Sequence, residues 1–171
     1  MKSKILILGS SGILGRNLVR NLHNKYHILH NGLVKRKFEL TKYNLLKDLI
    51  KKTNPDLVIN CSAITDLDYC ERNKLKSKKI NVGILKDLFS IRKIYKLNFK
   101  VIQISTDQMY SKKKGYKSTE KCKLVAHNEY TRQKLNAEKI SFNNSALILR
   151  LNFFSNEKKN LFKWILESCK K

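Results

Sequence analysis

The chain has 171 residues, a length typical of one domain. With 42% hydrophobic residues and one proline, its composition excludes a disordered or fibrous protein, and its uncharged stretches are too short to span a bilayer. The amino-terminal residues also lack the small-residue cleavage site of a signal peptide. We therefore expect a soluble, cytoplasmic protein with no membrane partner.

The basic excess is large, because 37 Lys and Arg residues against 13 Asp and Glu give a formal net charge of +24. Such a charge raises affinity for phosphate backbones, so nucleic-acid binding is one hypothesis. However, 30 of the 37 cations are Lys, they are spread along the whole chain, and no basic stripe alternates with aromatic residues. We therefore do not expect nucleic acid as the partner.

Cysteine and histidine spacings predict neither disulfides nor a metal site. The four cysteines include no Cys-x-x-Cys pair, so a zinc ribbon or a disulfide framework is not indicated. His23, His27 and His30 are close in sequence, but a helix should end before a strand that holds His27. The three imidazoles should then point apart, and no metal is expected.

Apolar periodicity predicts a regular alternation of strands and helices. The expected strands cover residues 4–8, 26–29, 38–40, 57–60, 101–104 and 146–149. The expected helices cover residues 13–22, 43–52, 80–97, 129–140 and 161–169. Strands joined through helices of this length need crossover connections, which predict a parallel sheet covered on both faces. The fold class is therefore α/β, with a Rossmann-like doubly wound sheet.

A glycine-rich turn is the strongest local signal. Three of the six glycines lie within seven residues between the first strand and the first helix. Such a turn can aim backbone N–H groups and the positive end of a helix at a pyrophosphate, because no Cβ blocks close approach. This context predicts a dinucleotide site whose binding residues include Gly9, Ser11, Gly12, Ile13, Leu14 and Gly15.

The end of the second strand bears on the choice of cofactor. Enzymes selective for NAD commonly place an acidic residue there to bind the ribose hydroxyls. No Asp or Glu stands near His30, and the basic run Lys35, Arg36 and Lys37 follows instead. We therefore expect NADP(H) to be preferred, with NAD(H) as the alternative.

A Tyr-x-x-x-Lys pair places a phenol and an ammonium on one helix face, where the cation makes the phenol a better proton donor. Three such pairs occur: Tyr43/Lys47, Tyr110/Lys114 and Tyr130/Lys134. Context favours the third, because Tyr130 opens a helix that follows a strand ending at Ser105-Thr106-Asp107. Thr106 would place its hydroxyl at the carboxyl end of that strand, facing the crevice.

Further segments extend this pattern along the chain in a fixed order. They are Gly9-x-x-Gly12-x-x-Gly15, Glu39-Leu40-Thr41, residues 55–65 with Asp68 and Glu71, Ile80-Asn81, Ser105-Thr106-Asp107, Asn128-x-Tyr130-x-x-x-Lys134 with Glu138, and Leu149-Arg150. Together they resemble the amino-terminal part of the extended short-chain dehydrogenase/reductases, most closely the dTDP-4-dehydrorhamnose reductases. The resemblance implies that residues 1–171 form a single NAD(P)-binding Rossmann domain.

The resemblance also implies roles for individual side chains. Tyr130 would donate a proton, Lys134 would assist it and bind the nicotinamide ribose, and Thr106 would bind the substrate carbonyl. The implied reaction is hydride transfer to a 4-keto sugar carried on a nucleotide. Further implied cofactor residues are Glu39, Leu40, Cys61, Ser62, Ala63 and Thr65, and further implied substrate residues are Asp107 and Phe153.

Some positions allow other interpretations. Cys61, Ser62 and Ala63 can be small simply because a strand and a helix pack closely there. The sequence also departs from the family at Gln108, usually Tyr, at Thr131 and Gln133, usually Gly and Ser, and at Phe153, usually Trp. Asn17 stands where some magnesium-binding relatives have an acidic residue, so no metal is carried over.

Length is the largest departure, since extended reductases continue for many more residues that form most of the sugar-nucleotide pocket. The chain is therefore expected to lack most of the family's substrate domain. A second chain that supplies this domain, or a homo-oligomer, remains open. The alternatives for function are a non-catalytic or truncated dinucleotide-binding regulatory protein, and a nucleotide-sugar epimerase or dehydratase, which would share Thr106, Tyr130 and Lys134.

Overall fold

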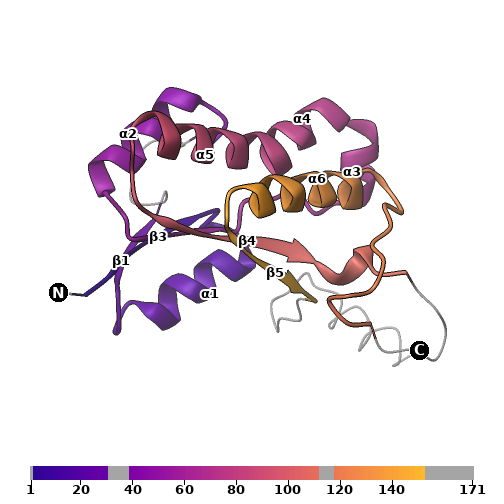
Figure 1. The fold of residues 1–171 in the computed structure, drawn as a ribbon, viewed down its shortest axis with the longest axis horizontal. Helices are drawn as coiled ribbons and strands as arrows, with labels where there is room; N and C mark the ends of the chain where they lie inside the picture. Colours follow the sequence, from indigo (N-terminus) through magenta and orange to yellow (C-terminus); the bar gives the residue numbers. More distant parts are fainter. Residues whose placement is uncertain (1, 31–38, 112–117, 153–171) are drawn as a thin grey trace.

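The computed structural model describes residues 2–30, 39–111 and 118–152. Their centre is a five-stranded sheet of order β2-β1-β3-β4-β5 in which every neighbouring pair is parallel (Figure 1). The strands are β1 (Lys4–Leu8), β2 (His27–His30), β3 (Leu57–Asn60), β4 (Lys100–Thr106) and β5 (Leu147–Leu151). The α/β, Rossmann-like prediction is confirmed.

Helices cover both faces of the sheet. Figure 1 shows α1 on one face and the longer helices α2, α5 and α6 on the other. The bounds are α1 (Ile13–Leu22), α2 (Tyr43–Thr53), α3 (Leu67–Arg72), α4 (Lys74–Lys78), the π-helical turn η2 (Lys79–Gly83), α5 (Ile84–Ile94), the 3-10 turn η3 (Asp107–Met109) and α6 (Glu129–Asn143). Within the described ranges, no helix is long and apolar enough to cross a membrane.

The alternation of side chains along each strand divides the core into two layers. Ile5, Ile7 and Ile59 pack with the apolar face of α1. Leu6 and Leu8 point to the opposite face and join the buried residues of α2 and α5. Because both faces of the sheet are covered, the central strands β1 and β3 are nearly continuous hydrophobic runs, as expected for a parallel sheet.

One predicted strand is wrong over its described part. Glu39 and Leu40 lie in a turn ahead of α2, where the Lys42 N–H donates to the Glu39 carbonyl at 3.0 Å and the Thr41 hydroxyl donates to the Glu39 carboxylate at 2.9 Å. These local bonds compete with strand pairing. Position 38 and the predicted helix 161–169 lie outside the described residues.

The helix predicted over residues 80–97 ends earlier than expected. It also does not begin at residue 80, because a helical segment before that residue runs into it. η2 leads into α5, which ends at Ile94, and Lys96 has the left-handed φ of 49° that terminates the helix. The Leu97 N–H then donates back to the Arg92 carbonyl at 2.9 Å. α3 and α4 were not predicted, because their short, charged sequences carry little apolar periodicity.

Candidate functional site

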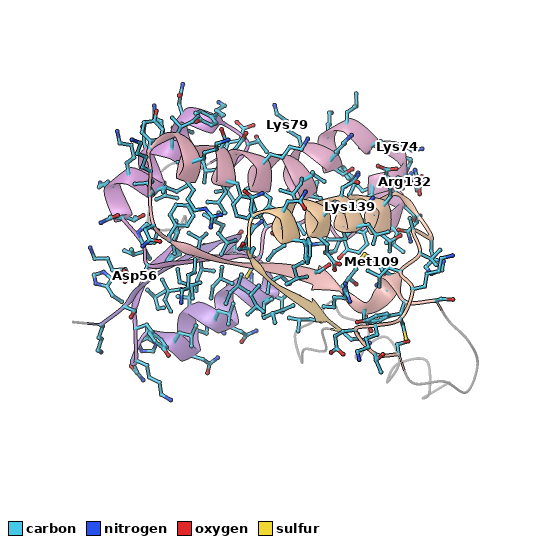
Figure 2. All side chains as sticks on the ribbon, viewed as in Figure 1. Asp56, Lys74, Lys79, Met109, Arg132 and Lys139 are labelled. Atoms are coloured by element: carbon cyan, nitrogen blue, oxygen red, sulfur yellow. The ribbon has the colours of Figure 1, made fainter. Side chains whose placement is uncertain are left out.

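The candidate site lies at the carboxyl ends of the strands. Chain order in the sheet reverses between β1 and β3, which is the point where ligands bind in open α/β sheets. In Figure 2, Asp56 marks the amino edge of the sheet and Met109 lies beyond the carboxyl edge. The glycine turn follows β1, and the loop formed by residues 61–65 follows β3, so both reach this point.

Gly9 brings the glycine turn against the loop after β3. Its φ is 75°, and a Cβ there would lie 2.7 Å from the Ser62 nitrogen and 2.8 Å from the Cys61 carbonyl carbon. Only glycine avoids both the strained φ and this overlap. Gly15 is packed as tightly, since its Cβ would overlap the Gly9 carbonyl oxygen.

The turn delivers the amino end of α1 to the crevice. The Gly12 N–H donates to the Gly9 carbonyl at 3.1 Å, and α1 begins at the next residue. The N-cap residue is Gly12, which has no side chain to cap α1, and the first turn of α1 holds no acidic residue. A helix end of this kind presents N–H donors and a partial positive charge.

Asn81 of η2 fixes the loop formed by residues 61–65. Its Oδ1 accepts from the Ile64 N–H at 2.7 Å, and its Nδ2 donates to the Ile64 carbonyl at 3.0 Å. Asn81 is buried, so these bonds are shielded from water. The side-chain amide therefore holds one loop residue through both of its backbone groups.

Gln133 connects this loop to α6. The Asn81 Nδ2 also donates to the Gln133 Oε1 at 2.8 Å, and the Gln133 Nε2 donates to the Ser77 hydroxyl at 2.9 Å and to the Glu129 carboxylate at 3.1 Å. Figure 2 shows Lys74 of α4 and Arg132 of α6 at the end of the molecule where these helices meet. Sequence reasoning noted Asn81 and Gln133 but did not predict that they contact each other.

Tyr130 and Thr106 meet at the end of β4. Tyr130 is only 5% exposed, and the Thr106 side chain lies close enough to its phenol to affect the pKa of Tyr130. Burial raises the pKa of Tyr130 to about 12, although the neighbouring Thr106 side chain opposes the shift. Tyr130 is therefore a protonated phenol at neutral pH.

Lys134 lies one turn further along α6. Its Nζ donates to the Ile104 carbonyl at 2.9 Å and lies 5.8 Å from the centre of the Tyr130 ring. Burial lowers the pKa of Lys134 to about 8, opposed by the nearby Cys61 and Glu138. Burial also raises the pKa of the Cys61 thiol to about 12, against the Lys134 charge. The structure thus brings four predicted site residues together: Cys61, Thr106, Tyr130 and Lys134.

Two serine hydroxyls in this region are buried without a hydrogen-bond partner among the described residues. They are the Oγ atoms of Ser62, just after β3, and of Ser105, near the end of β4. A buried hydroxyl without a partner is unfavourable in a folded protein.

Other predicted site residues are less closely grouped. Ala63, Thr65 and Asp107 are partly or fully exposed, and Ser11 is exposed in the glycine turn. Glu39 is exposed, and bonds from Thr41 and Lys42 lower the pKa of its carboxyl. Leu40 instead packs against the core beside α2. Phe153 and the basic run 35–37 lie outside the described residues.

The other two Tyr–Lys pairs have different surroundings. Tyr43 packs against the core, and the Tyr110 hydroxyl accepts a bond from Arg150 at 3.2 Å. Arg150 also donates to both carboxylate oxygens of Glu138, at 2.8 and 2.9 Å among other contacts. This ion pair joins β5 to α6. Arg150 and Glu138 therefore help to hold against the sheet the helix that carries Tyr130 and Lys134.

The sheet order and the glycine turn define a Rossmann-like α/β protein. A family model described as RmlD substrate binding domain matches residues 3–171, and the chain belongs to that family. The resemblance inferred from the sequence is thereby confirmed.

The relatives are longer than this chain. A probable low-salt glycan biosynthesis reductase, Agl14, from Haloferax volcanii is 29% identical over 158 residues, which cover 86% of this chain and 52% of the relative. A dTDP-4-dehydrorhamnose reductase from Aggregatibacter actinomycetemcomitans is 27% identical over 118 residues, covering 68% and 38% of the two chains. The chain therefore spans about half, or less, of the length of these curated relatives.

Solved structures share the fold. A dTDP-4-dehydrorhamnose reductase from Bacillus anthracis, in complex with NADP, superposes with a TM-score of 0.85 at 22% identity and covers 99% of this chain and 61% of that one. A hypothetical dTDP-4-dehydrorhamnose reductase from Sulfolobus tokodaii gives a TM-score of 0.76 at 32% identity, with coverages of 86% and 55%.

Proposed function

We propose that the chain is the cofactor-binding part of an NADP(H)-dependent reductase that acts on a nucleotide-linked 4-keto sugar in deoxysugar or polysaccharide synthesis. The observation that carries the proposal is the grouping of Thr106, Tyr130 and Lys134 at the carboxyl end of β4, two strands from the glycine turn. Family membership and the names of the relatives support the same reaction class.

The described residues fit a dinucleotide. The Gly9 turn gives a pyrophosphate close access to backbone N–H groups, and the amino end of α1 supplies positive partial charge. The hydroxyls of Ser62, just after β3, and of Ser105, near the end of β4, have no hydrogen-bond partner among the described residues. NADP is bound in the related structure from Bacillus anthracis, which supports NADP(H) over NAD(H).

When bound, reduced nicotinamide supplies a hydride to the sugar carbonyl carbon. Tyr130 then passes its phenolic proton to the developing alkoxide oxygen, which becomes the product hydroxyl. Thr106 donates a hydrogen bond to the same oxygen, and Lys134, as an ammonium, stabilises the phenolate left on Tyr130. The raised pKa of Tyr130 keeps its proton in place until the oxygen becomes basic.

Substitution of Tyr130 tests this assignment. Tyr130→Phe should reduce NADPH oxidation with dTDP-4-keto-6-deoxy sugar by about 10²- to 10⁴-fold, because the proton donor is lost, while NADPH affinity stays near that of the wild type. Tyr43→Phe is the matched control, since Tyr43 packs against the core on an earlier helix, and it should retain the rate. Equal rates for Tyr130→Phe and the wild type would contradict the proposal.

A second candidate is a non-catalytic dinucleotide-binding protein, or one whose substrate domain comes from another chain or another copy. The observation that favours it is the coverage of about half, or less, of the curated relatives. NADPH binding without turnover of the wild type would support this candidate. A nucleotide-sugar epimerase or dehydratase, which would use the same three residues, would convert its substrate without net NADPH oxidation.

A further inference from the structure

Three charged side chains lie where α6 packs against the sheet. Lys134 and Glu138 are one helical turn apart on α6, and they are only 2% and 6% exposed. Arg150 of β5 forms an ion pair with Glu138 at 2.8 Å. Charges interact far more strongly in the interior of a protein than in water. The Arg150–Glu138 pair can therefore influence the charge state of Lys134.

The sheet brings Arg150 to the same part of α6 as the anchor of Lys134. The helix packs against both β4 and β5 (Figure 1). In the parallel register, Arg150 stands opposite Ser105 of β4. The preceding residue of β4, Ile104, provides the carbonyl that accepts the bond from the Lys134 Nζ. Lys134 and Arg150 are thus held at neighbouring positions of adjacent strands.

Arg150 fixes the Glu138 carboxylate from two sides. Its Nε donates to Oε1 at 2.9 Å and its Nη2 donates to Oε2 at 2.8 Å, which makes the ion pair bidentate. Its Nη1 donates to the Tyr110 hydroxyl at 3.2 Å and to the Glu120 carbonyl at 3.5 Å, so the guanidinium is itself held in place. Arg150 therefore sets the position of the carboxylate, and the carboxylate acts on Lys134 through its charge.

The groups that face Lys134 come from several elements. Burial lowers the pKa of Lys134, and Cys61 of the loop after β3, Glu138 of α6 and Cys70 of α3 oppose this shift. Burial raises the pKa of both thiols, so neither is charged at neutral pH. The Tyr130 phenol, whose ring centre lies 5.8 Å from the Lys134 Nζ, is also neutral. Among these described groups, the anion is the Glu138 carboxylate.

We propose that Glu138 and Arg150 are positioning residues for the proposed reaction: Glu138 keeps Lys134 in its ammonium form, and Arg150 limits this effect by holding and partly neutralising Glu138. The proposal rests on the proposed function, because it concerns the cation that would stabilise the Tyr130 phenolate. Removal of the two partners should shift the titration of Lys134 in opposite directions. An ion pair with a purely structural role would respond alike to the loss of either partner.

NMR titration of the full 171-residue chain with isotope-labelled lysine tests the proposal. The Lys134 signal is identified as the one missing from Lys134→Arg. Glu138→Gln should lower its titration midpoint by about one pH unit, because an opposite charge is removed. Arg150→Met should raise the midpoint, because the carboxylate then acts without its counter-ion. The matched controls, Asp48→Asn and Arg132→Met, remove exposed charges of the same signs and should leave the midpoint near that of the wild type.

The alkaline decline of kcat/KM should move with the NMR midpoint in each variant, which a purely structural role would not produce. Midpoints that shift in the same direction in Glu138→Gln and Arg150→Met, or that match the controls, would overturn the proposal. Opposite shifts in a chain without NADPH turnover would support the charge coupling and count against the proposed function alone.

The comparison holds even if a single variant does not fold, which circular dichroism shows. If Arg150→Met is unfolded, Arg150→Gln takes its place with the same expected rise of the midpoint. If Glu138→Gln is unfolded, the double variant Glu138→Gln/Arg150→Gln is compared with Arg150→Gln, and its midpoint should be lower. An equal midpoint in these two proteins would also overturn the proposal.

Discussion

Lys134 is the residue whose environment most constrains the proposed activity. An ammonium buried beside the Ile104 carbonyl has lost most of its hydration, and the pKa of Lys134 falls from the usual 10.5 to about 8. Its positive charge, which would stabilise the Tyr130 phenolate, is therefore present below pH 8 and lost above it. A lysine with the ordinary pKa would stay charged both below pH 8 and for some distance above it.

The pH dependence of the proposed reaction follows from the pKa of Lys134. We expect kcat/KM for NADPH-dependent reduction to decline as the pH rises through about 8, which is the pKa of Lys134. Lys134→Arg keeps a cation at high pH, so the variant should be slower but should lose this alkaline decline. A wild-type profile that stays flat through pH 8, or a decline that survives in Lys134→Arg, would contradict the role given to this ammonium.

Gly9 shows how one residue can set the geometry of the crevice. Gly9→Ala should lower the free energy of unfolding by at least about 1–2 kcal/mol, since alanine is strained at positive φ and its Cβ would meet the Ser62 backbone. Gly83→Ala is the control, because its Cβ would have ordinary contacts at 3.8 Å in a helical segment. We expect that variant to be neutral or stabilising by about 0.5–1 kcal/mol. Urea unfolding measures both, and equal effects would contradict this interpretation.

At the scale of elements, the connection from η2 to α6 links the loop formed by residues 61–65 to the helix that carries Tyr130 and Lys134. Asn81 binds both backbone groups of Ile64 and the Gln133 amide. Asn81→Leu should cost about 1–3 kcal/mol of stability, because it leaves buried partners unsatisfied, and it should weaken NADPH binding several-fold by releasing the loop. Asn21→Ala removes only an exposed bond on α1 and should change neither quantity. Equal NADPH affinities in the two variants would show that the loop does not depend on Asn81.

Elements with a long apolar face were predictable from the sequence. β1 and β3 have the predicted bounds, and α2 ends one residue later than expected, where Asn54 adopts a left-handed φ of 40° before Pro55. Residues 39 and 40 of the strand expected at 38–40 lie in a turn instead, because a three-residue pattern is too short to outweigh polar turn contacts. The π-helical turn η2 was also missed, since its residues read as part of an ordinary helix.

The candidate site was predictable only in part. Tyr130, Lys134 and Thr106 carry recognisable spacing and strand-end context, and the structure brings them together. The contact between Asn81 and Gln133 joins residues far apart in sequence, and buried amides follow no periodic pattern. Thr131 was noted only as a departure from the family, yet its hydroxyl accepts from the Asn128 N–H at 3.0 Å and completes a capping box that starts α6.

At the scale of the whole molecule, one sheet separates two apolar layers and brings its functional candidates to a single edge. The glycine turn after β1, the loop after β3 and Thr106 at the end of β4 all lie at the carboxyl ends of adjacent strands. This arrangement explains how residues separated by more than half of the chain can act on one ligand.

The central claim is that a dinucleotide binds at the glycine turn and reaches Tyr130. Calorimetric titration of the 171-residue chain with NADPH tests it most directly, with Gly15→Val as the comparison, because a side chain at Gly15 would overlap the Gly9 carbonyl oxygen. We predict saturable binding at one site in the wild type and at least a tenfold loss of affinity in Gly15→Val that remains folded by circular dichroism. No detectable heat with millimolar NADPH, or equal affinity in the two proteins, would contradict the account.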